Sequence, residues 1–467
     1  MWSTAPMTGP RPRHIPVERD DCLELDIVGL GDGPDGLGRL DQYVVFVPGT
    51  LPGERAYVRI TSANRKFARA ELLELLTASP ERVEPRCPHF LQCGGCHRQH
   101  QDYRAQLRDK QARLQRTVHF GLGEHGPIVA PTVAAKPPYS QRHKVVVHLR
   151  NTRNDGLEAC FHRLRSPELV AITECPASDP LAWDLAMRTI ELLHDLPHGA
   201  WDPDFAPNAL LRSVLVRTTT TGDAHLLLVA RDPFIPGLED LLPDLHDAGA
   251  TTISVNGNNG EFSVLLGPET KLISGPPRIQ ERIGDIFYLI SPDAFFQTSP
   301  QAAGHLVERV TAWLAPGRDD DVLDLYCGGG LLTLPLALRA RRALGVELSR
   351  TAARDAEAAA VANRLRNVEF RAGHAEACLN TIRRGELPRP HLVAMDPPRT
   401  GLDPVVIDEL RRLRPRRLAY VSCEPQALQR DLQALQAAGF RTASVTPIDM
   451  FPQTCHVESL ACLELAQ

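Results

Sequence analysis

Two residues near the C-terminus combine nucleophilic and acid–base chemistry at the ends of predicted strands. Cys423 follows the apolar run RLAYVS, and Asp396 follows the apolar run HLVAM, directly before two prolines. Because ligands bind at the carboxyl ends of parallel strands, we expect both side chains to face one crevice. A thiolate can add to a substrate, and a carboxylate can bind a cation or move a proton. The structural alternative is an unrelated sheet with a buried cysteine.

A glycine-rich segment upstream is typical of a nucleotide-type cofactor site. The strand VLDLYC precedes Gly328–Gly330, and the run LLTLPLALRARR predicts a helix after the glycines. The next strand, RALGVE, ends in Glu347, whose carboxylate can accept hydrogen bonds from two ribose hydroxyls. This pattern alone is compatible with NAD or with S-adenosylmethionine. The later cysteine and Pro-Pro turn favour S-adenosylmethionine, because hydride transfer needs neither, and Asp324 can meet a cationic ligand.

A second group of cysteines indicates metal binding. Cys87, Cys93 and Cys96 fall within ten residues of CPHFLQCGGCHRQH. Cys175, which a proline follows, is the best candidate for a fourth thiolate. Four thiolates suit zinc or an iron–sulfur cluster, and the uneven spacing with a remote Cys-Pro favours the cluster. The alternative is a set of three unrelated buried thiols.

The elements that position these residues fall into three predicted domains. Residues 15–78 contain short β-favouring runs broken by glycine, proline and asparagine, which predict an OB-like β-barrel. Residues 79–290 predict a mixed α/β central domain that carries the metal site. Residues 291–467 alternate strand and helix and therefore predict a Rossmann-like α/β domain.

Positive charge is local in this chain. The net charge is −5, so the bulk composition gives no indication of nucleic acid. A predicted helix nevertheless carries five basic residues: Arg104, Arg108, Lys110, Arg113 and Arg116. With a second basic run at 142–165 they predict a phosphate-binding patch, although such runs also occur as solvated faces. No apolar run reaches the length of a membrane span, and we expect a cytoplasmic protein.

In their order, these segments resemble the RNA uracil-C5 methyltransferase family, whose members make 5-methyluridine in tRNA and ribosomal RNA. VPGTLPGERAYVRI resembles the TRAM domain, and the cysteine segment with Cys175 resembles the family's 4Fe–4S site. The motifs DAFFQTSP, DLYCGGG, GVELS, DPPRTGL, YVSCEP and QTCHVE follow in the family's order. The resemblance implies a class I methyltransferase domain, S-adenosylmethionine and a 4Fe–4S cluster as cofactors, and tRNA or 23S ribosomal RNA as the partner. We expect a monomer.

The resemblance also implies a role for individual residues. The cofactor contacts are Gln297, Tyr326, Gly328, Glu347 and Asp396. Cys423 would add to C6 of uridine, which turns the ring into an enolate with charge on C5. After methyl transfer, Glu458 would remove the C5 proton. Three positions depart from the residues usual in the family: Leu331, His374 and Glu424.

Two other interpretations of the same residues stay open. An amino-group methyltransferase also places an acidic or amide residue before Pro-Pro, but an aromatic residue follows where this chain has Arg399. A non-enzymatic RNA-binding iron–sulfur protein or RNA chaperone needs neither Cys423 nor Glu458. RNA that contains 5-fluorouridine distinguishes these classes, because only an enzyme that adds a thiolate to C6 is trapped on it.

Overall fold

The structure is a computed structural model that describes residues 15–123, 126–153, 156–260 and 264–466. By its internal contacts the chain divides into two units. The first ends at Gln106 and also includes Gln453–Cys455. The second comprises Leu107–Pro452 and the C-terminal residues from His456 onward. Each unit is described by itself.

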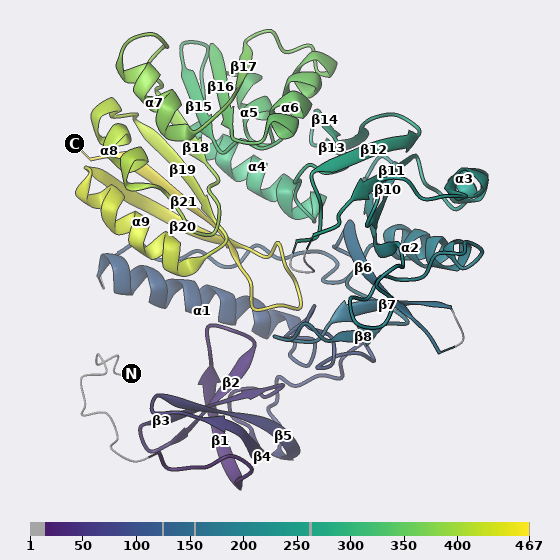
Figure 1. Cartoon of the computed structure of the whole chain (residues 1–467). Helices are drawn as coiled ribbons and strands as arrows, with labels where there is room; N and C mark the ends of the chain where they lie inside the picture. The colour runs from purple at the N-terminus through teal and green to yellow at the C-terminus, as the bar shows by residue number, and fades with distance from the viewer. Residues whose placement is uncertain (1–14, 124–125, 154–155, 261–263, 467) are drawn as a thin grey trace. The chain divides into compact units, whose positions relative to one another are not determined.

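A closed five-stranded β-barrel opens the first unit, with the strand order β1-β2-β3-β5-β4 (Figure 1). Its strands are β1 (Cys22–Leu30), β2 (Asp35–Leu40), β3 (Tyr43–Pro48), β4 (Arg55–Ala63) and β5 (Phe67–Thr77). Alternate side chains point inward; in β3 these are Tyr43, Val45 and Val47. The predicted N-terminal β-barrel is therefore confirmed, since period-two burial of apolar residues fills its interior.

The segment that follows the barrel contains little regular secondary structure. A distant residue, Gln453, forms hydrogen bonds with residues 79–106. The backbone N–H groups of His97 and Arg98 both donate to its carbonyl oxygen, at 2.8 and 3.0 Å. The chain therefore returns to its first unit shortly before its last strand.

The second unit begins with most of a long helix, α1 (Tyr103–Leu122), and continues into a seven-stranded central sheet of order β12-β11-β10-β9-β6-β7-β8. The strands are β6 (Lys144–Asn151), β7 (Leu157–His162), β8 (Leu169–Ala171), β9 (Leu211–Thr218), β10 (Ala224–Ala230), β11 (Thr252–Gly257) and β12 (Glu269–Ser274). Helix α2 (Pro180–Leu193) packs on β9 and on α3 (Leu238–Asp247). Every residue of β9 and β10 is buried, because both strands lie in the middle of the sheet.

A hairpin of β13 (Ile279–Ile283) and β14 (Ile286–Ile290) leads into a second seven-stranded sheet, of order β17-β16-β15-β18-β19-β21-β20. Its strands are β15 (Asp321–Leu325), β16 (Arg342–Glu347), β17 (Val368–Ala372), β18 (Leu392–Met395), β19 (Arg417–Ser422), β20 (Phe440–Ile448) and β21 (Glu458–Leu465). The first five strands in this spatial order are parallel, and β21 is antiparallel to both of its neighbours.

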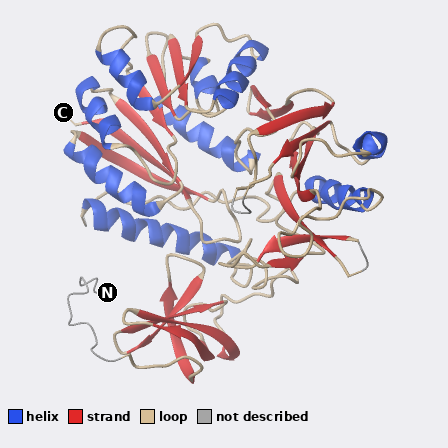
Figure 2. Cartoon of the chain, viewed as in Figure 1, coloured by secondary structure: helices blue, strands red, loops and turns tan. Residues whose placement is uncertain are grey.

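Helices flank this sheet (Figure 2). They are α4 (Pro300–Leu314), α5 (Thr333–Ala337), α6 (Arg350–Ala362), α7 (Ala375–Arg383), α8 (Pro404–Leu413) and α9 (Pro425–Ala437). Neighbouring residues of β15 enter different cores: Val322 packs with α4–α6, and Leu323 packs with α7–α9. The predicted Rossmann-like α/β domain is confirmed, because the sheet is covered on both faces.

One predicted helix is shorter than its sequence indicates. The run 331–342 forms only α5, because Arg342 begins β16 and pairs with Asp321 of β15. Strand pairing therefore overrides the helical propensity of the leucine- and alanine-rich run. Of the helices in the described residues, none has both the length and the apolar character that a bilayer crossing requires.

Candidate active site

The carboxyl end of β15 opens into a tight turn. Tyr326, Gly328 and Gly330 all have positive φ, at 63°, 54° and 84°. Such values suit glycine but strain a tyrosine, so the surrounding structure must hold Tyr326 in place. Glu347, at the end of β16, joins the turn: its carboxylate accepts hydrogen bonds from Gly328 N (2.9 Å) and Ser349 N (2.7 Å). The structure thus places together the glycine turn and the acid that the sequence predicted.

A buried carboxyl group lies at the base of this turn. Asp324 is 1% exposed, and its Oδ2 accepts a hydrogen bond from Thr333 Oγ1 at 2.6 Å. Its Oδ1 is buried without a hydrogen-bond partner among the described residues. Burial, opposed by the Thr333 bond and reinforced by nearby Asp396, raises the pKa of Asp324 to about 8. A buried oxygen of this kind is suited to a ligand that brings a donor or a positive charge.

Strands β19 and β21 bring Cys423 and Glu458 together. The two antiparallel strands pair Ser422 with Ser459, the immediate neighbours of the two residues. Burial first and Glu458 second raise the pKa of the partly buried Cys423 thiol to about 11, whereas Arg399 lowers it. The thiol is therefore protonated at neutral pH, and nucleophilic attack needs a group that takes this proton.

Two further carboxyl groups near Cys423, Glu458 and Asp396, also have raised pKa values. Glu458 is 4% exposed, and its Oε1 has no hydrogen-bond partner within the described chain. Burial and the neighbouring Asp396 raise the pKa of Glu458 well above its usual value. Burial raises the pKa of Asp396 to about 7. A carboxyl group with a pKa of about 7, as Asp396 has, exchanges protons near neutral pH, as general acid–base catalysis requires.

The loop that follows Asp396 is fastened by a residue that the sequence analysis missed. Asp431 of α9 is 1% exposed, and its Oδ2 accepts hydrogen bonds from Leu402 N (2.8 Å) and Tyr420 Oη (2.7 Å). Gly401 has a φ of 78°, and a Cβ atom there would lie 2.3 Å from Asp431 Oδ2. Asp431 thereby ties the 396–402 loop to β19, the strand that directly precedes Cys423. No motif marks Asp431 in the sequence.

Gln297 lies on a loop between β14 and α4 that packs against the glycine turn. Its neighbour Phe296 is buried and contacts the ring of Tyr288, with the ring centroids 5.5 Å apart. A Cβ atom on Gly329 would lie 3.9 Å from Phe296 Cδ2. The structure therefore brings the predicted cofactor contact Gln297 to the same sheet edge as the glycine turn.

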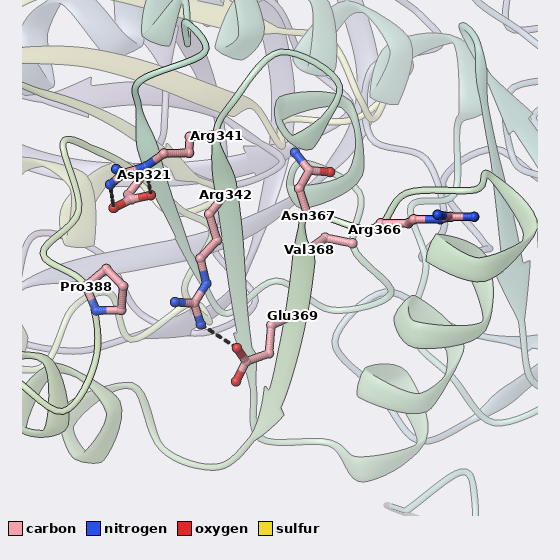
Figure 3. A pocket seen from close by; sticks show the side chains of 8 residues that line it. All are labelled: Asp321, Arg341, Arg342, Arg366, Asn367, Val368, Glu369 and Pro388. Carbon is pink, nitrogen blue, oxygen red and sulfur yellow. Dashed lines mark hydrogen bonds and ion pairs between the residues drawn. The ribbon is translucent and has the colours of Figure 1, made fainter.

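A different pocket, of about 560 Å³, lies at the amino ends of β15–β17 (Figure 3). It is lined by Asp321, Arg341, Arg342, Arg366, Asn367, Val368, Glu369 and Pro388. Ion pairs join Arg341 to Asp321 and Arg342 to Glu369 (Figure 3), each at 2.5 Å. Because parallel strands place their carboxyl ends at the opposite edge, this pocket is separate from the crevice of Cys423.

Comparison with known proteins agrees with this geometry. A sequence model of the tRNA (uracil-5-)-methyltransferase family matches residues 269–465, and a TRAM-domain model matches residues 17–73. The chain is 33% identical to an RNA methyltransferase of Halalkalibacterium halodurans over 456 residues, which are 97% of this chain and 99% of the relative. This chain belongs to the tRNA (uracil-5-)-methyltransferase family. It is an S-adenosylmethionine-dependent RNA uracil-5-methyltransferase.

A solved structure supports the fold of this methyltransferase over most of its length. The tRNA (uracil-54, C5)-methyltransferase of Pyrococcus abyssi, solved in complex with S-adenosyl-L-homocysteine, aligns with a TM-score of 0.75 and 26% identity. The alignment covers 94% of this chain and 99% of that chain. An RNA methyltransferase of Nostoc is 32% identical over 96% of this chain and 97% of its own length. The resemblance found in the sequence motifs is thus confirmed.

Three departures from the usual family residues have different surroundings in this methyltransferase. Leu331 is buried in the core, and its carbonyl oxygen accepts a hydrogen bond from Tyr288 Oη at 3.0 Å. His374 is exposed at the N-cap position of α7, and its side chain forms no capping hydrogen bond there. Glu424 is the N-cap of α9, where its carboxylate accepts a hydrogen bond from Gln426 N. Glu424 therefore does what a capping asparagine would do.

The predicted metal ligands divide between the two units of the methyltransferase. Cys87, Cys93 and Cys96 lie partly buried on the loop segment of the first unit. Cys93 Sγ accepts a hydrogen bond from Gly95 N at 3.3 Å, a contact that also tunes metal-bound thiolates. Cys175 lies partly buried in the second unit, after β8.

The predicted basic patch is only partly available to RNA. On α1, Arg104, Arg108 and Arg116 are exposed. Lys110 is buried, and its Nζ pairs with Asp449 Oδ1 at 2.5 Å, so its charge is neutralised within the protein. This burial corrects the prediction that Lys110 belongs to a phosphate-binding surface.

In the basic run 142–165, two arginines are also paired. Arg150 bonds Glu158 at 2.7 Å, and Arg163 bonds Glu168 at 2.8 Å. Sequence counts missed the second pair because Glu168 lies beyond the run. These pairs are exposed and weak, so an RNA phosphate can still compete for the arginines.

Proposed function

We propose that this methyltransferase methylates C5 of a uridine in tRNA or 23S ribosomal RNA through a covalent bond between Cys423 and C6 of the base. The register of Ser422 with Ser459 supports the proposal, because their neighbours Cys423 and Glu458 then lie close together. Uracil C5 is a poor nucleophile, and thiolate addition at C6 turns the ring into an enolate that is a good one. A uridine in a stack must be flipped out before Cys423 can reach it.

The protein's residues then act in sequence. The Cys423 thiol gives its proton to a solvent water molecule, and its sulfur bonds to C6 while the electrons of the C5–C6 double bond move onto the enolate. S-adenosylmethionine supplies the methyl group that C5 takes up. The Glu458 carboxylate removes the C5 proton, and the electrons of that C–H bond restore the C5–C6 double bond and expel the sulfur. The burial that raises the pKa of Glu458 favours its protonated product state.

The residues of the glycine turn fit a positively charged cofactor. A Cβ atom on Gly328 would meet no atom within 4 Å, so the backbone there leaves room for a ligand. The partnerless Oδ1 of Asp324 lies at the base of the turn. We propose that the cofactor is held by Gln297, Tyr326, Gly328, Glu347 and Asp396. The positive charge of S-adenosylmethionine would then offset the buried carboxyl groups.

Trapping on 5-fluorouridine RNA tests the covalent mechanism. Fluorine at C5 cannot leave as a proton, so the wild-type enzyme with S-adenosylmethionine should form a protein–RNA band that resists denaturant. Cys423→Ala should give no such band while its RNA affinity, measured by filter binding, stays within about twofold of wild type, a difference of less than 0.5 kcal/mol. A band of wild-type intensity from Cys423→Ala would sink the assignment of the nucleophile.

We further propose three domains in chain order: an RNA-binding barrel, 15–78, a central domain, 79–290, and the catalytic domain, 291–467. In this proposal Cys87, Cys93, Cys96 and Cys175 of the central domain bind a 4Fe–4S cluster. The uneven cysteine spacing and the Gly95–Cys93 hydrogen bond support the cluster. Protein purified without oxygen should be brown and contain iron and acid-labile sulfide. Colourless protein with one zinc ion per chain would contradict the iron–sulfur assignment.

A further inference from the structure

A buried arginine of the central sheet reaches the loop that carries Gln297. Arg217 of β9 is 3% exposed. Its Nη2 donates to the carbonyl oxygen of Ala294 at 3.0 Å, and its Nη1 donates to that of Phe296 at 3.4 Å. One guanidinium therefore holds the two carbonyl groups on either side of Phe295, a geometry for which its planar fork is suited.

The loop that Arg217 binds connects the central sheet to the glycine turn within the second unit. Phe296 packs on Tyr288 and near Gly329 of the cofactor turn. Phe295 is 69% exposed, and Gln297 follows directly. A shift of the two carbonyl groups would therefore move Phe296 against the glycine turn and would redirect its neighbours on both sides.

Residues just before β6 bind the part of the loop that follows Gln297. The His143 N–H donates to the carbonyl oxygen of Thr298 at 2.9 Å, and Ser299 Oγ donates to Gln141 Oε1 at 2.9 Å. These contacts follow Gln297, whereas those of Arg217 precede it. The central domain thus forms hydrogen bonds with the loop both before and after Gln297, the predicted cofactor contact.

Arg217 is not explained by the needs of its own sheet. The neighbouring strand β6 pairs the partly buried Lys144 with the buried Arg217, so two cations adjoin. Burial lowers the pKa of Arg217 to about 10, which leaves it charged at neutral pH, and buried Glu281 partly offsets the charge. Burying a charge in this way is costly, and a hydrophobic residue would fill a β9 position more cheaply.

We propose that Arg217 is a positioning residue for methyl transfer, which sets the 294–299 loop so that Gln297 meets the cofactor. The central domain then contributes to the cofactor site itself. The proposal rests on the proposed cofactor role of Gln297.

Arg217→Met tests this, because it keeps much of the side-chain volume and removes both hydrogen bonds. The KM for S-adenosylmethionine should rise, and kcat/KM should fall on the order of 10- to 100-fold, the size of effect that a misplaced site residue produces. RNA affinity should stay near that of wild type. A wild-type KM and kcat/KM would overturn the proposal.

Arg212→Met is the matched control. Arg212 is also on β9 and 6% exposed, and its Nη1 donates to the carbonyl oxygens of Asn258 (2.6 Å) and Gly260 (2.9 Å). The Arg212→Met variant likewise removes two hydrogen bonds from a buried arginine to backbone carbonyl groups, and these groups lie outside the 294–299 loop. If both variants lose stability to a similar extent but only Arg217→Met loses cofactor affinity, the effect is positional. Equal losses of affinity would mean a general loss of structure and would contradict the proposal.

A double variant separates this proposal from the proposed function. If Arg217 acts through Gln297, Arg217→Met should add little to the effect of Gln297→Ala on the Kd for S-adenosylmethionine. Fully additive effects would contradict the proposal. A wild-type Kd for Gln297→Ala alone would instead refute the cofactor role of Gln297. Should Arg217→Met not fold, Arg217→Lys and Arg217→Gln replace it, and a wild-type KM in both would overturn the proposal.

Discussion

Glu458 and Asp324 each keep one carboxyl oxygen in the interior without a hydrogen-bond partner among the described residues. A buried polar atom in that state costs about 1–3 kcal/mol of stability. Both atoms lie on the sheet edge that carries Cys423, and both belong to groups whose pKa burial raises. These unpartnered oxygens destabilise the fold at one edge of the sheet. Such a cost is expected at a functional site, where a bound ligand supplies the missing partners.

Replacement of the proposed base should leave the enzyme stuck on its product adduct. Glu458→Gln keeps the shape of the side chain but cannot take the C5 proton, so addition and methyl transfer proceed and elimination does not. We expect a denaturant-resistant band with ordinary uridine RNA and turnover reduced by about 10²–10⁴. Glu424→Gln is the control, since Glu424 caps α9, and it should give no band. Wild-type turnover by Glu458→Gln would exclude Glu458 as the base.

The reactivity of Cys423 should depend steeply on pH. Because its pKa is raised to about 11, the thiolate fraction, and with it the rate of alkylation by iodoacetamide, should rise about tenfold per unit between pH 7 and pH 10. Arg399→Gln removes the positive charge that lowers this pKa, so alkylation should be slower at each pH. Peptide mapping by mass spectrometry gives the rate at Cys423. A rate that levels off below pH 9 would contradict the raised pKa.

The sequence pointed to the residues that we propose to perform the chemistry but not to those that hold them. Cys423 and Glu458 stand in ordered motifs that few other folds share. Asp431 and Arg217 stand in no motif, and only the folded chain brings them to the loops they fasten. Lys110 shows the reverse error: its place in a basic run suggested phosphate binding, but the fold pairs it with Asp449, a residue 339 positions away.

Among the elements, the Pro-Pro loop depends on one glycine. Gly401→Ala would combine a positive φ with a contact of 2.3 Å to Asp431 Oδ2, whereas Gly439→Ala has a φ of 94° and meets no atom within 4 Å. Gly439→Ala should therefore cost only the backbone strain, about 1–2 kcal/mol. Gly401→Ala should cost more free energy of unfolding in urea and should also lower kcat. Equal stability losses and wild-type kcat in both would show that the Asp431 contact is unimportant.

The elements themselves were largely predictable, because strand and helix periodicities alternate clearly after residue 320. The predicted strand RALGVE is β16, and the five basic residues of the predicted helix, from Arg104 to Arg116, all lie in α1. The helix predicted at 331–342 was too long, because the pairing of Arg342 with Asp321 is a contact between strands that local sequence does not encode.

For the whole molecule, RNA binding should depend strongly on salt despite the net charge of −5. Each phosphate contact releases condensed counterions, so log Kobs should fall linearly with log salt concentration. Arg104→Glu with Arg116→Glu, both exposed on α1, should reduce the steepness by about one to two units and leave S-adenosylmethionine affinity unchanged. Arg188→Glu, which changes an exposed side chain of α2, is the control. An unchanged salt slope in the α1 variant would place the RNA elsewhere.

The return of the chain at Gln453 fixes the order in which the protein can mature on the ribosome. The barrel can close early, since its strands lie within Cys22–Thr77. The cysteine segment that follows the barrel cannot complete its contacts early, because Gln106 Nε2 donates to Gln453 Oε1 at 3.0 Å, across 347 positions of the chain. At about 5–20 residues per second, translation delivers Gln453 roughly 17 to 70 seconds after Gln106. A nascent chain therefore displays its clustered thiols, with their closing contact still unmade, until Gln453 has been synthesised.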